Sequence, residues 1–317
     1  MRRLNSALLA LVSLTAAVGA LVGGSRLAIA QTFPAADRWR PLVCGPGAGV
    51  MVDALGDTPN ASGGLDLIGT DAAPAGFRAS DDNFLYLRLR LDGDPTAKNR
   101  LLANGWGFEI DLDGVRSTYE LLLSVDGLGP TDVISVWRNS VHTLANDPAD
   151  PADAPPAFTY PFATHGRTSV ADTSQGGNPD YFLDFAVRWN DLATLGIHPA
   201  TPASVWAGSS TVADALDLDL ACHDGAGGRL DGIDVGRTVL DPFVDSDGDG
   251  TSDAGELAAG TNPNDPNSHP AGSGGTGPRT LEGGPGCAIV PHPSHGYPML
   301  LAGLALLFFA RIRRKRV

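Results

Sequence analysis

The chain has 317 residues, and its 36 acidic side chains outnumber its 22 basic ones. So acidic a protein lacks the basic face that neutralises phosphate groups, and we expect no nucleic-acid partner. Its three cysteines exclude a dense disulfide framework and a zinc site built from four thiolates.

Residues 1–30 have the pattern of a secretory signal peptide. Two arginines precede a mostly apolar run over residues 7–22, and a small-x-small triplet ends at Ala30. This order is typical of a leader that signal peptidase removes after Ala30. A retained membrane helix is the weaker alternative, because residues 23–26 end the apolar run early. We therefore expect an exported protein.

Residues 31–242 have the pattern of an all-β domain. Short runs rich in β-forming residues alternate with clusters of Gly, Asp, Asn and Pro at the spacing typical of a β-sandwich. No segment offers the long amphipathic helix that a βαβ unit requires. The sequence therefore predicts a β-sandwich. Its expected strands cover residues 83–91, 106–112, 118–125, 133–138, 181–187, 203–210 and 216–222.

Several local signals refine this prediction. Residues 83–91 alternate between leucines and larger polar or aromatic residues, which predicts a half-buried strand with the leucines inside. The Asp-Gly pair at residues 113–114 predicts a hairpin turn. The acidic, proline-rich residues 146–156 should be extended or mobile, because proline blocks helix and ladder alike. Residues 189–193 should form a short helix that ends before Gly196.

Cys44 and Cys222 lie near the two ends of this domain. In an exported protein we expect them to form a disulfide that ties the first strand to the last, worth ~2–4 kcal/mol through its constraint on the unfolded chain. Two unrelated thiols are the weaker alternative, because only these two cysteines remain once the C-terminal tail is processed.

The runs YLRLRLDGDP, WGFEIDLDG, STYELLLSVDG and YFLDFAVRWNDL resemble the family 9 carbohydrate-binding-module-like and DOMON-like sandwiches of exported bacterial proteins. The resemblance spans about residues 50–220 and implies a β-sandwich in which a sugar-binding cleft can form. Tryptophans are candidates for stacking on a sugar, although a Trp on a strand more often packs in the core. The five candidates are Trp39, Trp106, Trp137, Trp189 and Trp206.

Residues 245–256, DSDGDGTSDAGE, match every specified position of the calcium loop D-x-[DN]-x-[DN]-G-x5-E. So many acids in twelve residues repel one another unless a cation neutralises them. A solvated acidic linker, the alternative, would need neither Gly250 nor Glu256 at those offsets. The expected Ca2+ ligands are Asp245, Asp247, Asp249, the backbone carbonyl of Thr251, Asp253 directly or through water, and both oxygens of Glu256.

The context of this loop distinguishes between calcium modules. Residues 240–244 cannot supply the entering helix of a paired EF-hand. The loop is followed by LAAGTNPNDP, and residues 243–266 together resemble the thrombospondin type 3 repeat of bacterial surface proteins. The resemblance implies that aspartates bind calcium and stiffen a stalk. Because this copy is single and cannot share ions with neighbouring repeats, we expect weak binding, at ~0.1–1 mM.

The remaining residues have the composition of a tether and a tail. Residues 267–286 are a Gly/Ser/Pro linker, which we expect to be disordered. Residues 287–317 contain an apolar run over residues 298–310 and five basic residues after it. The run is shorter than the ~20 residues of a stable span, but flanking arginines can snorkel to extend it. We expect a short transmembrane helix whose basic end stays in the cytoplasm.

The order of Gly286 and Cys287, a short apolar stretch and a basic end resembles the MYXO-CTERM class of sorting signals on myxobacterial surface proteins. The resemblance implies that the tail first holds the protein in the inner membrane. A dedicated sorting protease then cleaves near Cys287, and the protein moves to the outer surface. By this resemblance Cys287 is the processing and anchoring residue. A plain membrane anchor with an incidental thiol is the alternative.

Loss of residues 1–30 and of the basic tail would leave 14 basic against 36 acidic side chains, a net charge of −22 that attracts divalent cations. Three function classes remain: a surface-displayed module that binds an extracellular glycan or protein, a structural or adhesion stalk stiffened by calcium, and a secreted hydrolase. The chain has no H-E-x-x-H or G-x-S-x-G motif, and acidic pairs such as Glu109 with Asp111 are expected by chance. We therefore expect a calcium-binding protein that is not an enzyme.

Overall fold

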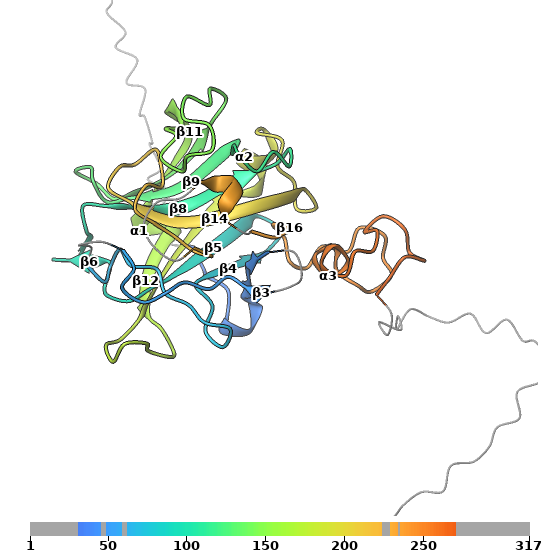
Figure 1. The fold of residues 1–317 in the computed structure, drawn as a ribbon, viewed down its shortest axis with the longest axis horizontal. Coiled ribbons are helices and arrows are strands. Elements are labelled where there is room, and N and C mark those ends of the chain that lie inside the picture. Colours follow the sequence, from blue (N-terminus) through green and yellow to red (C-terminus); the bar gives the residue numbers. More distant parts are fainter. Residues whose placement is uncertain (1–30, 46–48, 59–61, 224–228, 234, 271–317) are drawn as a thin grey trace, which may run out of the picture. The chain divides into compact units, whose positions relative to one another are not determined.

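Two antiparallel sheets packed face to face make up most of the fold, which confirms the all-β prediction (Figure 1). The computed structural model describes residues 31–45, 49–58, 62–223, 229–233 and 235–270. The first sheet has the strand order β1-β4-β5-β13-β12. Its strands are β1 (Arg40–Pro41), β4 (Gly76–Ser80), β5 (Phe84–Leu91), β12 (Gly166–Val170) and β13 (Tyr181–Arg188).

The second sheet has seven strands in the order β11-β10-β9-β8-β14-β15, and β16 also pairs with β14. Its strands are β8 (Gly105–Asp111), β9 (Leu121–Asp126), β10 (Val133–Arg138), β11 (Asp153–Pro161), β14 (Pro202–Ser210), β15 (Asp219–Leu220) and β16 (Arg237–Val239). Two small ribbons accompany the sheets: β2 (Val43–Cys44) with β3 (Gly49–Val50), and β6 (Thr96–Ala97) with β7 (Arg100–Leu101).

Helices are short and few in the described ranges. They are α1 (Phe162–His165), α2 (Trp189–Ala193), α3 (Asp253–Ala259) and the 3-10 turns Ala36–Arg38 and Leu230–Gly232. The short helix predicted at residues 189–193 is confirmed as α2. Gly196 follows it with φ of +88°, a left-handed conformation that glycine adopts without a Cβ penalty.

The main core lies between the two sheets. The four leucines of β5 are fully buried there, and they pack with Phe185 of β13 against Phe108 and Leu123 of the facing sheet. The leucine-inside prediction is therefore confirmed. The prediction of a half-buried strand is wrong, because β5 is buried on both faces. Arg88 and Arg90, on its other face, are only 8% and 2% exposed.

The proline-rich residues 146–156 are extended at their C-terminal end, which is one of the two alternatives predicted for this segment. Asp153 begins the edge strand β11, which pairs with β10. Asp150 is buried, and its carboxylate accepts hydrogen bonds from the side chains of Asn139 and Thr143 and from the amide of Leu144. The predicted strand at 216–222 is reduced to Asp219–Leu220, and β4, β11 and β12 lie where no strand was predicted.

Cys44 and Cys222 form a disulfide with a Cα–Cα distance of 5.6 Å. The bond joins β2 to the segment after β15. It does not join the first strand to the last, as the sequence suggested, because β1 precedes Cys44 and β16 follows Cys222.

A second apolar cluster covers the outer face of the seven-stranded sheet. Trp206 of β14 and Leu122 of β9 belong to it and lie on either side of Glu109 of β8 in the strand register. Glu109 is 0% exposed, and no described donor reaches its carboxylate in hydrogen-bonding geometry. Burial raises the pKa of Glu109 well above its ordinary value. The nearby Leu216 amide offsets part of this rise, and repulsion from Asp150 adds to it.

We expect Glu109→Gln to stabilise the fold at high pH only. In the unfolded chain Glu109 ionises near 4.5, whereas in the folded protein it holds its proton to higher pH. Unfolding then releases a proton, so the free energy of unfolding falls as the pH rises above 4.5. Glutamine cannot ionise. The variant should match the parent near pH 4 and exceed it by about 1–3 kcal/mol at pH 8.

Urea unfolding at both pH values measures this difference, and Asp71→Asn, which changes an exposed acid, is the matched control. A stability difference that does not change with pH would contradict the prediction.

Several predictions concern residues outside the described ranges. These are the signal peptide at 1–30 with its cleavage site at Ala30, most of the linker at 267–286, and the sorting tail at 287–317 with Cys287. Among the residues that the structure describes, no helix has the length and apolar character needed to cross a bilayer.

Candidate calcium loop

The loop at residues 245–252 is closed at its base and leads directly into α3. The amide of Asp253 donates to the carbonyl oxygen of Val244 across the base, at 2.9 Å. Ser252 caps the helix, because its hydroxyl accepts from the amide of Gly255. The helix ends at Gly260, whose φ of +72° is the left-handed C-terminal cap. The module is thus a loop followed by one short helix.

Two glycines give the loop its turn. Gly248 has φ of +76° and Gly250 has φ of +93°, which a side chain would strain, although open space surrounds both positions. Both amides point at the first aspartate of the loop. Gly248 donates to Oδ1 of Asp245 at 2.8 Å, and Gly250 donates to Oδ2 at 3.0 Å.

Three aspartates converge inside this turn. One carboxylate oxygen from each of Asp245, Asp247 and Asp249 lies within 4.8 Å of the other two. Oδ1 of Asp247 accepts from the Asp249 amide at 3.1 Å, and Oδ1 of Asp249 accepts from the Thr251 amide at 2.7 Å. The second oxygen of both residues, Oδ2, is shielded from solvent and accepts no hydrogen bond. Backbone amides therefore orient the carboxylates and leave shielded oxygens available to a cation.

Glu256 is a buried acid of the module that has no hydrogen-bond donor among the described residues. It lies on α3 and is 0% exposed, and neither oxygen of its carboxylate has a hydrogen-bond donor among the described residues. Burial raises the pKa of Glu256 above its ordinary value, and repulsion from Asp247 and Asp249 raises it further. A divalent cation would remove both penalties, because it would replace the missing donors and neutralise the neighbouring charges.

Asp253 has a contact that the sequence pattern does not reveal. Its Oδ1 accepts from the amide of Ser246 at 2.7 Å, and its Oδ2 accepts from the Ser246 hydroxyl at 2.6 Å. Both oxygens of Asp253 thus accept from Ser246 and hold the loop to the start of α3. The sequence pattern suggested instead that Asp253 is a calcium ligand. A serine at the second loop position with an aspartate at the ninth is the signal that could have indicated this contact.

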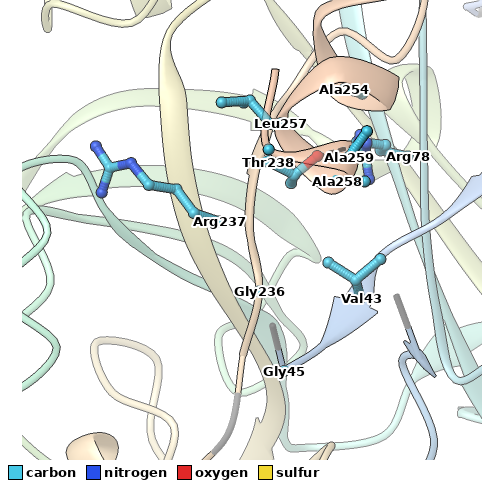
Figure 2. A pocket seen from close by; sticks show the side chains of 11 residues that line it. Val43, Gly45, Arg78, Gly236, Arg237, Thr238, Ala254, Leu257, Ala258 and Ala259 are labelled. Atoms are coloured by element: carbon cyan, nitrogen blue, oxygen red, sulfur yellow. Dashed lines mark hydrogen bonds between the residues drawn. The ribbon is translucent and has the colours of Figure 1, made fainter. Parts of the chain in front are cut away.

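Helix α3 lies beside β16, and a cavity of about 430 Å3 is lined by residues of both (Figure 2). Ala254, Leu257, Ala258 and Ala259 of α3 form one side of it. Arg78 and Thr238 lie close to the helix, whereas the side chain of Arg237 extends away from it (Figure 2). The cavity between α3 and β16 is thus lined largely by small side chains.

Two further acidic groups come together in the described part of the chain. One consists of Asp53, Asp57 and Asp219, and the other of Asp111, Asp113 and Glu120. Sequence reasoning missed the first because its members are far apart in the chain. It noted Asp111 only as one of a chance pair with Glu109. Asp219 is fully buried, and burial raises its pKa to about 7.

The tryptophans lie mainly in the interior. Trp106 and Trp206 are 0% exposed, Trp39 and Trp189 are 5% and 7% exposed, and Trp137 is partly buried. The core-packing interpretation therefore holds for most of them. Trp39 also lines a hollow of about 370 Å3 on the outer face of the five-stranded sheet.

Residues 245–266 match the family model of the bacterial TSP3 repeat. The match includes the aspartate loop, α3 and the Gly-Thr-Asn-Pro segment, and it nearly coincides with the predicted repeat at 243–266. TSP3 repeats are calcium-binding, so the match supports calcium as the ion for this loop. No curated protein and no solved structure matches the chain.

Proposed function

We propose that the loop at residues 245–256 binds one calcium ion and that the ion stiffens the end of the sandwich domain. Asp245, Asp247, Asp249 and Glu256 would hold it, with Thr251 contributing its backbone carbonyl. The observation that carries this proposal is the set of shielded carboxylate oxygens on Asp247, Asp249 and Glu256 that accept no hydrogen bond. Hard oxygen ligands of this kind favour Ca2+.

Stiffening follows from the connection of the loop to α3. Glu256 belongs to the helix and the aspartates belong to the loop, so one ion bound to both holds the helix against the turn. Because α3 lies beside β16, ordering the helix also limits the movement of the segment that leaves the sandwich. The linker after Asn267 would then follow an ordered segment of the protein.

We further propose that the protein is exported and displayed on the cell surface. The leader at 1–30 and the tail at 287–317 support this, with a sorting protease acting near Cys287. Outside the cell, calcium at about 1 mM would suit a single weak loop.

The sandwich is proposed to bind an extracellular ligand, such as a glycan or a protein. The hollow on the five-stranded sheet supports this role, because aromatic side chains and arginines line it together. They are Trp39, Phe77, Phe182, Arg88 and Arg90. A glycan array probed with the full chain separates this role from that of a calcium-stiffened stalk, which would give no reproducible hits.

Glu256→Gln tests the calcium loop. We expect the parent protein to become more resistant to proteolysis within residues 245–266 as calcium rises to about 10 mM, because the ion orders the loop. The variant loses a bidentate anionic ligand, and its midpoint for protection should rise about tenfold or more.

Limited proteolysis with mass spectrometry locates the cleavage sites, and Asp71→Asn is the matched control. Equal protection of parent and variant, or no protection of the parent, would refute the calcium role of this loop.

A further inference from the structure

The turn between β8 and β9 carries an acidic cluster on the sandwich itself, outside the matched repeat. Asp111 ends β8, Glu120 directly precedes β9, and Asp113 lies at the exposed tip of the turn. One carboxylate oxygen from each lies within 4.8 Å of the other two. The strand pairing of β8 with β9 brings the two ends of the turn together.

Backbone amides of the turn orient all three carboxylates through one oxygen each. The Gly114 amide donates to Oδ1 of Asp111 at 2.6 Å, and the Val115 amide donates to Oδ1 of Asp113 at 2.8 Å. The Leu112 amide donates to Oε2 of Glu120 at 2.6 Å.

The remaining oxygens are the independent sign of a ligand. Asp111 is 0% exposed, yet its Oδ2 accepts no hydrogen bond, and the shielded Oε1 of Glu120 accepts none either. A buried carboxylate oxygen without a donor destabilises the fold, because it has lost its hydrogen bonds to water. Two such oxygens in one cluster indicate a missing positive partner.

Two arginines lie in or against this turn. The Arg116 guanidinium donates to the carbonyl oxygen of Ile233. The ion pairs of the described residues lie elsewhere, and none involves Asp111, Asp113 or Glu120. Arg237 reaches the turn, but its guanidinium donates to the carbonyl oxygens of Leu112 and Pro202. The described hydrogen bonds of both arginines thus go to backbone carbonyl oxygens rather than to the three carboxylates.

The turn also repeats the local geometry of the matched loop. Asp111-Leu-Asp113-Gly114 has the spacing of Asp245-Ser-Asp247-Gly248, and both glycines are left-handed, with φ of +85° and +76°. In each segment the glycine amide donates to Oδ1 of the first aspartate, at 2.6 and 2.8 Å. In each, the next amide donates to Oδ1 of the second aspartate.

We propose that Asp111, Asp113 and Glu120 bind a second calcium ion, held at the β8–β9 turn of the sandwich. The three carboxylates supply hard anionic oxygens, and water completes the coordination at the exposed tip. This site does not depend on the loop at 245–256, because the two share no residue. Its role is to fix the turn and to remove the repulsion that builds up at the ends of β8 and β9.

Calcium binding to the full chain tests the proposal, measured by titration calorimetry in four proteins. They are the parent, Glu256→Gln, Glu120→Gln and the double variant. We expect Glu256→Gln to retain a site that the double variant loses or binds about tenfold more weakly, because ligand charge sets calcium affinity. Asp113→Asn should have the same effect as Glu120→Gln, and it changes only an exposed side chain.

Thermal unfolding separates a lost ligand from a damaged fold. In chelator, Glu120→Gln should unfold at the same temperature as the parent or higher, because it removes repulsion. In 10 mM calcium the Glu256→Gln background should gain stability through this site alone, and that gain should vanish when Glu120→Gln is added. Asp71→Asn should change neither result.

Two results would overturn the proposal. One is a Glu256→Gln protein that binds no calcium; the other is equal calcium binding by Glu256→Gln and the double variant. Failure of the loop at 245–256 gives a different pattern, in which Glu256→Gln binds as much calcium as the parent does and with the same affinity.

Discussion

Replacing Cys44 and Cys222 by serine should lower the free energy of unfolding by about 4–5 kcal/mol, the largest effect we expect from any small change in this protein. This exceeds the ~2–4 kcal/mol typical of a disulfide, because the bond closes an unusually long loop. The two cysteines are 178 residues apart in the sequence. Cross-linking so long a segment removes much of the conformational freedom of the unfolded chain, and the loss grows with the logarithm of the loop length.

The structure adds a local reason for this effect. Cys44 lies in the two-residue strand β2, and Cys222 follows the equally short β15, so few ladder hydrogen bonds hold either segment. The Cys222 amide donates to the carbonyl oxygen of Val52 at 2.8 Å. Without the disulfide we expect this edge of the sandwich to open before the two large sheets do.

Urea unfolding of the double serine variant measures the change. Cys287→Ser is the matched control, because it removes a cysteine and leaves the disulfide between Cys44 and Cys222 intact. It also prevents thiol–disulfide exchange between Cys287 and that disulfide. The dependence of stability on urea should become steeper, since the unfolded chain expands. A double variant within 1 kcal/mol of the parent would contradict the prediction.

Arg88→Met should destabilise the protein by about 3–5 kcal/mol, because it leaves a buried carboxylate without its main partner. Asp184 is 0% exposed, and its two oxygens accept from Nε and Nη2 of Arg88 at 2.7 and 2.9 Å. Arg167 contributes a third bond at 2.7 Å but is itself 39% exposed. The Arg88 guanidinium also lies 4.1 Å from the ring centroids of Trp39 and Phe182.

Two further variants separate the contribution of the Arg88 charge from that of its side-chain shape. Arg88→Lys keeps the charge but loses the bidentate fork and the stacking on two rings, so it should cost an intermediate amount. The double variant Arg88→Met with Asp184→Leu removes both charges and should recover much of the loss. Urea unfolding of the single and double variants gives the coupling between the two residues.

Arg100→Met is the matched control for this series. Arg100 forms a 2.7 Å ion pair with Asp132, but its side chain is 46% exposed. Solvent screens such a pair, so the variant should lose less than about 1 kcal/mol. Equal losses for Arg88→Met and Arg100→Met would contradict the burial argument.

The sequence alone was sufficient where the physical cause is local. Strict alternation predicted the leucine face of β5, because side chains on a strand point to opposite faces with a period of two. The spacing of Asp245, Asp247, Gly250 and Glu256 predicted the candidate calcium loop, because its acids lie within twelve residues. The match to the bacterial TSP3 repeat supports that prediction.

Local pattern failed where the neighbours of a strand come from distant parts of the chain. The polar face of β5 appeared solvated, yet Asp184, on the paired strand β13, and Trp39, which precedes β1, bury Arg88. Similarly, Glu109 appeared to be one acid among many. Its burial depends on the cluster that includes Trp206 and Leu122 above the seven-stranded sheet.

The β8–β9 turn combines one feature that the local sequence predicts with others that depend on strand pairing. The sequence alone determined an Asp-Gly turn at residues 113–114, because the left-handed glycine is a local requirement. Only the tertiary structure brought Glu120 to Asp111, through the pairing of β8 with β9, and buried Asp111 and one oxygen of Glu120. Turn chemistry acts over a few residues, whereas burial and carboxylate convergence depend on which strands become neighbours.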